Sequence, residues 1–224
     1  MASVTVVKPR GGGGTGDLLT ACVAEHGSAA HPYFSSDALT RGPESARNLA
    51  DAVHFLCSLH GRHPGVIDHA AGRPMDEAAR AWLIAAGEAM AAERLCLTQL
   101  AVAAGPIPST PGGGGSEAAV IGQRNALTTL ALSDRRGCAL GASLAFALDW
   151  SPVRAVLDAA GRRLGIELPP SRMDGETDLR AVADVAGEAP ATERALLFGA
   201  QQLALQHRGL WDLLEARQQA RFDG

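Results

Sequence analysis

Lysine, aromatic residues and long apolar runs are all scarce in this sequence. Lys8 is the only lysine among 20 basic residues, and aromatic residues make up 4% of the 224-residue chain. Such a low aromatic content disfavours a β-sandwich, because strands are enriched in β-branched and aromatic side chains. The sequence contains neither a run of about eighteen apolar residues nor a secretory leader. We therefore expect a cytoplasmic protein that has no contact with a membrane.

The four cysteines are isolated from one another along the chain. Cys22, Cys57, Cys96 and Cys138 are tens of residues apart, and none belongs to a C-x-x-C pair. This spacing disfavours a zinc ribbon, a thioredoxin-type redox motif and a disulfide framework. We expect reduced thiols that serve as small core residues.

The charge balance disfavours nucleic-acid binding. The formal net charge is −4 and the sequence pI is about 6.0. Proteins that bind nucleic acid through its phosphates carry clustered basic surfaces, and this chain has only short arginine pairs. We expect no nucleic-acid partner.

Alanine and leucine dominate the segments that lie between clusters of glycine and proline, a composition typical of closely packed helices. The segments that we expect to be helical are 17–26, 43–60, 74–104, 116–149, 152–165, 177–186 and 190–222. They predict an all-α fold, an up-and-down helical bundle with about four main helices, three of them long, and short accessory helices. The expected domains are a flexible Gly-rich N-terminal tail over residues 1–16 and a single helical-bundle domain over residues 17–224.

Small residues recur at helical spacing in the long segments. Gly137, Gly141 and Ala145 are four residues apart, so they predict a close approach of two helix axes. Trp82, Trp211 and the leucine-rich helix faces predict an apolar patch that a second copy covers. We therefore expect a homodimer.

Four of the seven histidines fall within one short stretch, where a helical segment gives way to glycine and proline. Imidazole is the commonest protein metal ligand, so His54, His60, His63 and His69 are candidate ligands of a single transition metal. Glu88 or Glu93 on the following helix would supply the acidic partner. The alternative is structural, with His54 as a hydrogen-bonded core residue, His60 at a helix C-terminus and the other two in a loop.

The motifs of two common cofactor classes are absent. A di-iron bundle requires Glu-x-x-His pairs, and the sequence contains none. The glycine-rich strings lack the Gly-Lys-Ser/Thr ending of a phosphate-binding loop, so no nucleotide motif is found.

Polar residues inside otherwise apolar segments are the remaining candidates for a site. The residues that we expect to line a ligand pocket between helices are Tyr33, His54, Asn125, Asp134 and His207. Because the recognised catalytic spacings are absent, we expect a non-catalytic binding or self-association module for a small apolar ligand or a protein partner. The alternative is a histidine-centred metal-binding protein or metalloenzyme that uses the cluster from His54 to His69.

Overall fold

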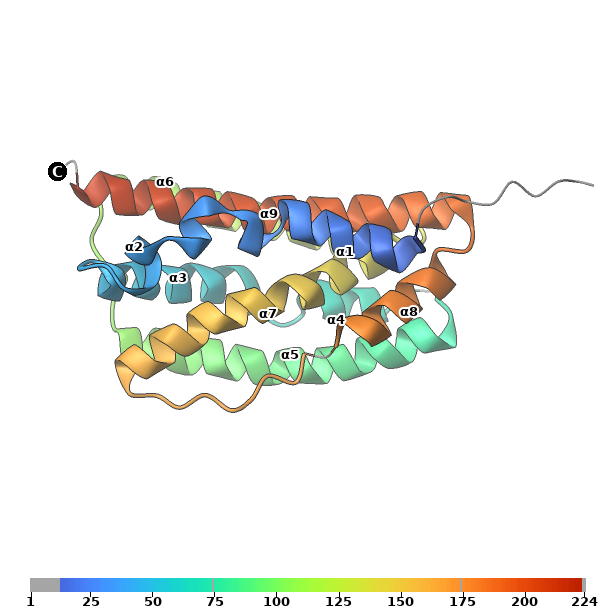
Figure 1. Ribbon diagram of the computed structural model, residues 1–224, viewed down its shortest axis with the longest axis horizontal. Helices are drawn as coiled ribbons and strands as arrows, with labels where there is room; N and C mark the ends of the chain where they lie inside the picture. The colour runs from blue at the N-terminus through green and yellow to red at the C-terminus, as the bar shows by residue number, and fades with distance from the viewer. Residues whose placement is uncertain (1–12, 74, 174, 223–224) are drawn as a thin grey trace, which may run out of the picture.

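The computed structural model describes residues 13–73, 75–173 and 175–222, and within these ranges the regular structure is entirely helical (Figure 1). The predicted all-α class is confirmed. The helices are α1 (Thr15–His26), α2 (Asp37–Thr40), α3 (Ser45–His60), α4 (Val66–Ala71), α5 (Glu77–Ala104), α6 (Gly113–Ala131), α7 (Cys138–Leu164), α8 (Glu176–Ala186) and α9 (Pro190–Phe222). Two short 3-10 helices, Ser28–Ala30 and Pro32–Ser35, connect α1 to α2.

Helix α7 lies at the centre of the bundle. Along α7, buried residues occur on every side of the helix, and α1, α3, α4, α5, α6 and α9 all pack against it. Helix α9 runs the length of the molecule and makes the most extensive contact with α7, while α5 forms the opposite edge (Figure 1). The arrangement explains why α7 is apolar around its whole circumference from Cys138 to Leu148, as is typical of a helix enclosed by others.

The closest contact in the bundle is between α7 and α9. A Cβ atom added at Gly141 would lie 1.9 Å from the carbonyl oxygen of Leu196, and one added at Gly199 would lie 2.0 Å from the carbonyl oxygen of Cys138. Glycine is therefore required at both positions for the two backbones to approach this closely. The small-residue spacing that included Gly141 correctly predicted a close helix contact.

The prediction of a single helix over residues 116–149 is wrong, because the chain turns between α6 and α7. Residues 132–137 are non-helical, and Gly137 adopts a φ of 97°, a left-handed conformation that ends the turn at the start of α7. The polar stretch that includes Asp134 was expected inside this helix, with Asp134 as a candidate pocket residue. It is a loop.

The predicted new helix from Pro152 is also wrong, since Pro152 lies inside α7. An internal proline costs about 3 kcal/mol because it removes one backbone hydrogen bond and crowds the preceding turn. Trp150 and Val153 are buried on either side of it, and burying side chains of this size contributes about 1.5–3 kcal/mol each. Tertiary packing therefore keeps the helix continuous through the proline.

Two further differences concern short segments. Helix α4 lies within the stretch between Gly61 and Pro74 that was expected to be a loop, and α6 begins at Gly113, inside a glycine string interpreted as a linker. Residues 1–12 of the predicted tail lie outside the described residues, whereas Thr15 already belongs to α1.

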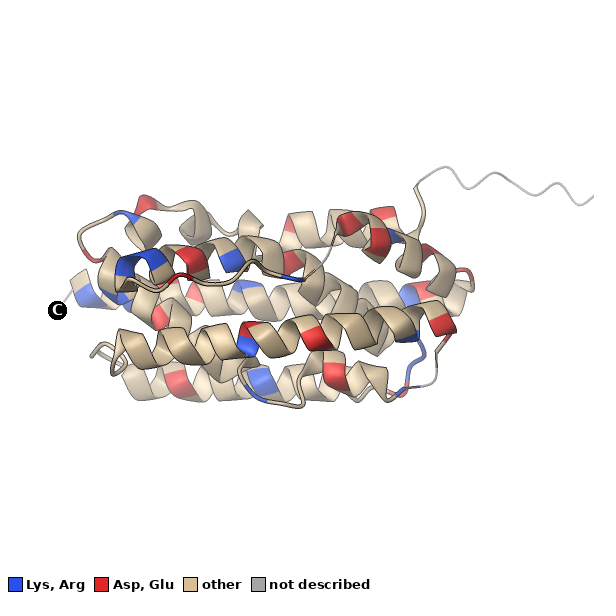
Figure 2. Cartoon of the chain, turned by 90° about the horizontal axis from the view of Figure 1, so that it is seen from below, with Lys and Arg blue, Asp and Glu red and all other residues tan. Residues whose placement is uncertain are grey.

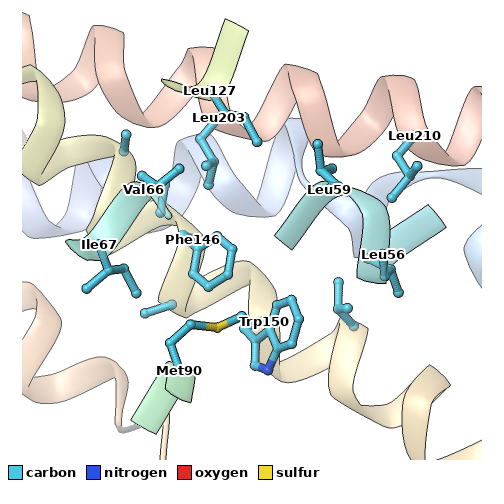
Figure 3. Packing of buried hydrophobic residues seen from close by; sticks show 14 of the residues in the cluster. Leu56, Leu59, Val66, Ile67, Met90, Leu127, Phe146, Trp150, Leu203 and Leu210 are labelled. Carbon is cyan, nitrogen blue, oxygen red and sulfur yellow. The ribbon is translucent and has the colours of Figure 1, made fainter. Parts of the chain in front are cut away.

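The core is a continuous apolar cluster around α7. In Figure 3, Phe146 lies among Val66, Ile67, Met90 and Trp150, which come from three different helices. Across the described ranges, no helix has the length and apolar character required to cross a membrane.

Candidate functional site

A hydrogen-bonded set of buried polar groups lies between α7, α9 and the first 3-10 helix. Asp149 of α7 accepts a hydrogen bond from the backbone N–H of Ser28 at 2.8 Å and one from the Ser28 hydroxyl at 2.5 Å. The Nδ1 atom of His207, from α9, lies 2.6 Å from the second carboxylate oxygen of Asp149. All three side chains are buried. Three elements distant in the sequence thus meet at one carboxylate.

The surroundings of Asp149 favour its ionised form. Burial alone opposes ionisation, but the hydrogen bond and charge of His207 and the two hydrogen bonds from Ser28 outweigh it, so the pKa of this carboxyl is lowered. An ionised carboxylate accepts hydrogen bonds, so it selects the form of His207 with a proton on Nδ1. The Nε2 atom of His207 is then the free ring position, and it is buried with no hydrogen-bond partner.

His60, at the end of α3, packs edge-on against the ring of His207. Their ring centroids are 4.9 Å apart, and His60 makes similar contacts with Phe146 at 4.9 Å and Trp150 at 5.8 Å. Burial, the neighbouring His207 and the charge of Arg94 lower the pKa of His60 well below its ordinary value. His60 is therefore neutral at pH 7.

Three buried nitrogen atoms in this cluster lack a partner: Nε2 of His60, Nε2 of His207 and Nε1 of Trp150. Buried polar atoms in native proteins are nearly always paired with protein, water or a ligand. Three such atoms on neighbouring rings distinguish this region as the strongest candidate site in the described chain.

The cluster opens onto a pocket bounded by α3, α4, α5, α6 and α7. His60 and Phe146 form part of its wall, and its volume is about 240 Å³. The apolar residues that line it are Leu59, Val66, Ile67, Met90, Leu127 and Phe146. These apolar residues are buried in the core, whereas Arg62, His63, Pro64 and Thr128 of the lining are exposed, so the pocket extends from the surface to the imidazole cluster.

The pocket also carries positive charge. Arg62, Arg94 and Arg124 all contribute to its lining. Arg94 forms an ion pair with Asp68, whose carboxylate also accepts the backbone N–H of Gly65 at 2.7 Å. Because only one carboxylate offsets three guanidinium groups, this region keeps a net positive charge.

The structure brings three of the predicted metal ligands to one place. His60, His63 and His69 all line the pocket. Glu88 is exposed on the outer side of α5, and Glu93 is buried in an ion pair with Arg154 at 2.6 Å. Among the described residues, no three His, Cys, Asp or Glu side chains are placed to hold a metal ion. The metal site stays a prediction, to be tested by elemental analysis of the purified protein.

The predicted ligand-binding residues are dispersed over the molecule. Of these five, His207 is in the buried cluster, while His54 lies on α3 outside the pocket lining. Tyr33 is buried in the second 3-10 helix, Asn125 is exposed on α6, and the side chain of Asp134 is 98% exposed in the loop before α7. Their roles in binding stay predictions.

Sequence reasoning did not identify Asp149, Ser28, Phe146 or Trp150 as members of the site. One signal was available for Asp149, which is the only charged residue between Gly137 and Trp150. A carboxylate in such an apolar run must be paired if the helix is enclosed. Its partners, however, come from segments 121 and 58 residues away, and only the fold identifies them.

Comparison with known protein families gave one finding. A family model described as "Family of unknown function (DUF6975)" matches residues 23–222. That range contains every residue of the buried cluster and of the pocket. Searches of curated proteins and of solved structures gave no match.

Proposed function

Since the chain belongs to the family of unknown function DUF6975, we propose a function from the pocket itself: it binds a small, largely apolar molecule that carries one anionic group. The observation that carries this proposal is the combination of an apolar pocket wall with three arginines, of which only Arg94 is paired with a carboxylate. Pockets between the helices of a bundle are common ligand sites.

The size of the pocket limits the ligand. A volume of about 240 Å³ is larger than the roughly 150 Å³ apolar cavity that accommodates benzene. It is smaller than the pockets of about 300–1,000 Å³ that enclose drug-sized molecules. A substituted benzene or a chain of roughly six to eight carbon atoms fits this range. Phe146, Met90 and Leu127 would contact its apolar part.

The arginines supply the second part of the ligand's chemistry. A guanidinium group binds carboxylates and phosphates through paired hydrogen bonds, and such bonds strengthen away from water. Arg124 is the best placed of the three, because its only hydrogen bond is a long one of 3.5 Å to the carbonyl oxygen of Ser58. Arg94 is already held by Asp68. Arg124 would therefore bind the anionic group.

We propose binding without catalysis because the described residues that line the pocket include neither a carboxylate nor a thiol. Acid–base or nucleophilic catalysis needs such a group, or a histidine of suitable pKa, within hydrogen-bond reach of the substrate. Three histidines line the pocket, and His60 is the buried one, whose lowered pKa makes it a weak base. It would accept or donate a hydrogen bond as a neutral group.

Calorimetric titration with phenylacetate tests the proposal, with 2-phenylethanol as the neutral control of similar shape. We expect phenylacetate to bind and 2-phenylethanol to bind at least about tenfold more weakly, which corresponds to roughly 1.4 kcal/mol. In Arg124→Gln the two affinities should become similar, because the residue that distinguishes them is gone.

A pair of neighbouring variants locates the binding. Thr128 lines the pocket from the exposed side of α6, whereas Thr129 is exposed and not part of the lining. Thr128→Trp should fill the entrance and abolish binding, and Thr129→Trp should leave it unchanged. Absence of binding of both compounds at 10 mM, or binding that survives Thr128→Trp, would contradict the proposed function.

We also propose self-association as a homodimer. The observation in its favour is that α5 exposes Ile84, Leu95 and Val102. Apolar side chains of this size gathered on one face characterise a protein interaction surface.

A further inference from the structure

The outer face of α5 carries large apolar side chains in a single row. Ile84 is 55% exposed, Leu95 is 68% exposed and Val102 is 78% exposed. Together with the exposed Ala91, they follow one another at intervals of seven, four and seven residues. These intervals place all four on one face of a helix. We call these four residues the α5 row.

Charge is sparse beside the row. The last ten residues of α5 contain no charged side chain, and in Figure 2 the corresponding end of the helix is uncoloured while charges of both signs mark its first part. Between Ala81 and Ala104, Glu88 is the only exposed charged residue of α5. A partner for this face must therefore be mainly apolar.

The spacing of the row identifies that partner as a second copy of the same helix. Ile84 and Val102 are each nine residues from position 93, and Ala91 and Leu95 are each two residues from it. A second α5, antiparallel to the first and related to it by a twofold axis at position 93, therefore places Ile84 opposite Val102 and Ala91 opposite Leu95. Each large side chain meets an apolar one, as a self-complementary interface requires.

The surface beside Val102 is shaped to receive a side chain. A groove of about 550 Å³ runs between the end of α5 and the loop after α7, and Val102 and Ile166 are part of its lining. In the antiparallel pair, Ile84 of the partner subunit lies at this groove. Glu88 lies opposite Thr98 of the other copy, and the groove carries one charged residue, Glu167, at its edge.

We propose that the chain forms a twofold dimer through the α5 row, with two antiparallel α5 helices in contact. This inference rests on the proposed self-association and specifies its surface. The row extends over about 27 Å at 1.5 Å per residue. One helix pair of this length lies near the lower limit for a specific interface, about 1,200 Å² in total. We therefore expect a dimer that dissociates at micromolar concentration.

Sedimentation analysis from about 1 to 500 µM tests the surface. Leu95→Lys should weaken dimerisation at least about a hundredfold, since it places two lysines next to the twofold axis. The matched control is Ile121→Lys, which changes a similarly exposed apolar residue on α6. A wild-type chain that is monomeric throughout would overturn both self-association and this inference. A dimer that is insensitive to Leu95→Lys would overturn the inference alone.

Spin-label distances test the register, with Cys22 and Cys57 replaced by serine so that the label enters one site. Arg80 and Glu88 are exposed on α5 beside the row. About position 93, the two copies of residue 80 are separated by about 39 Å along the axis and the two copies of residue 88 by about 15 Å. The distance between the two labels of a dimer should therefore be longer for Arg80→Cys than for Glu88→Cys, by about 24 Å along the helix axis. Equal distances for the two sites indicate parallel helices and would overturn the proposed register.

Discussion

Helix α9 supplies the basic partner for two buried carboxylates, and the two pairings use different bases. Arg217 and Arg221 bind Asp51 of α3, at 2.9 Å and 2.6 Å, whereas His207 binds Asp149 of α7. Arginine keeps its charge at every pH at which proteins fold, while histidine gains or loses its proton near neutrality. The Asp51 cluster is therefore a permanent ionic link, whereas the base in the Asp149 cluster is an imidazole.

The two clusters also differ in what surrounds them. Both oxygens of Asp51 have arginine partners, and the same arginines bind Thr110 and Pro108 of the loop before α6. That network fastens a loop and two helices together. The Asp149 cluster instead lies beside unpartnered ring nitrogens and an empty volume. One buried carboxylate joins a loop to two helices, and the other lies in the cluster beside the proposed ligand pocket.

The largest expected effect on the free energy of unfolding is at the Asp51 cluster. Asp51→Asn leaves two buried guanidinium groups without a counter-charge, and breaking a buried ion pair in this way costs about 3–5 kcal/mol. We expect a loss of this size in the free energy of unfolding, measured by urea denaturation at pH 7. A loss below about 1 kcal/mol would show that the two arginines find other partners.

A smaller loss in the free energy of unfolding is expected at the Asp149 cluster. Asp149→Asn replaces an ionised acceptor of three hydrogen bonds, which should cost about 1.5–3 kcal/mol. The loss is smaller than at Asp51 because Asp51→Asn leaves two guanidinium groups that stay charged. Urea denaturation of the two variants under one condition measures the difference directly. An Asp149→Asn loss equal to or above that of Asp51→Asn would remove the distinction between the clusters.

The pH dependence of stability sharpens the same comparison. Because the pKa of folded His60 lies below the ordinary value of 6.5, the unfolded chain binds a proton at His60 before the folded chain does. The free energy of unfolding should therefore decrease as the pH falls below about 6.5, by up to roughly 1.4 kcal/mol per pH unit for this one proton. Asp149, with a pKa lowered from 3.8, adds a loss of the same sign in more acidic solution.

The His60 contribution is isolated by substitution. In His60→Leu the slope between about pH 6.5 and 5 should be shallower by up to one proton, whatever the change in stability at pH 7. His69→Leu is the control, since that side chain is partly exposed on the pocket wall. If His60→Leu and wild type have parallel pH profiles, His60 is protonated in the folded protein and the site is open to water.

The smallest expected effect is at an exposed ion pair, which serves as the baseline. Asp134, 98% exposed, lies 3.0 Å from Arg73. Such pairs contribute little because water screens them. Asp134→Asn should leave the urea midpoint unchanged within error. A measurable loss there would mean that the losses at Asp51 and Asp149 owe less to burial than we infer.

Local signals in the sequence predicted much of the fold. The breaks at Gly61 and Gly105, and the extent of α5 and α9, follow from glycine, proline and helical periodicity. The continuous helix through Pro152 was missed because packing against other helices, which local composition does not report, keeps it intact. The turn after α6 was missed because Gly137 was assigned to a helical pattern of small residues, whereas it adopts a left-handed conformation.

The site was less accessible to sequence reasoning than the fold. The histidine cluster in the sequence included His60, and the polar residues within apolar segments included His207; the structure buries both. Neither observation linked the two, because their contact depends on how α3 and α9 are rotated about α7. Asp149 was missed since its partners are remote in the sequence. Pairing among buried polar groups is a property of the tertiary structure.

Because other helices enclose α7, hydrogen exchange at its amides depends on unfolding of the whole bundle. Amide hydrogens of an enclosed helix exchange with solvent deuterium only when the surrounding helices separate, whereas those of an exposed helix also exchange through local fraying. The amides from Ala142 to Trp150, where every side chain except the partly buried Leu148 is buried, should thus be among the slowest to exchange. Their exchange rates would measure global stability without denaturant.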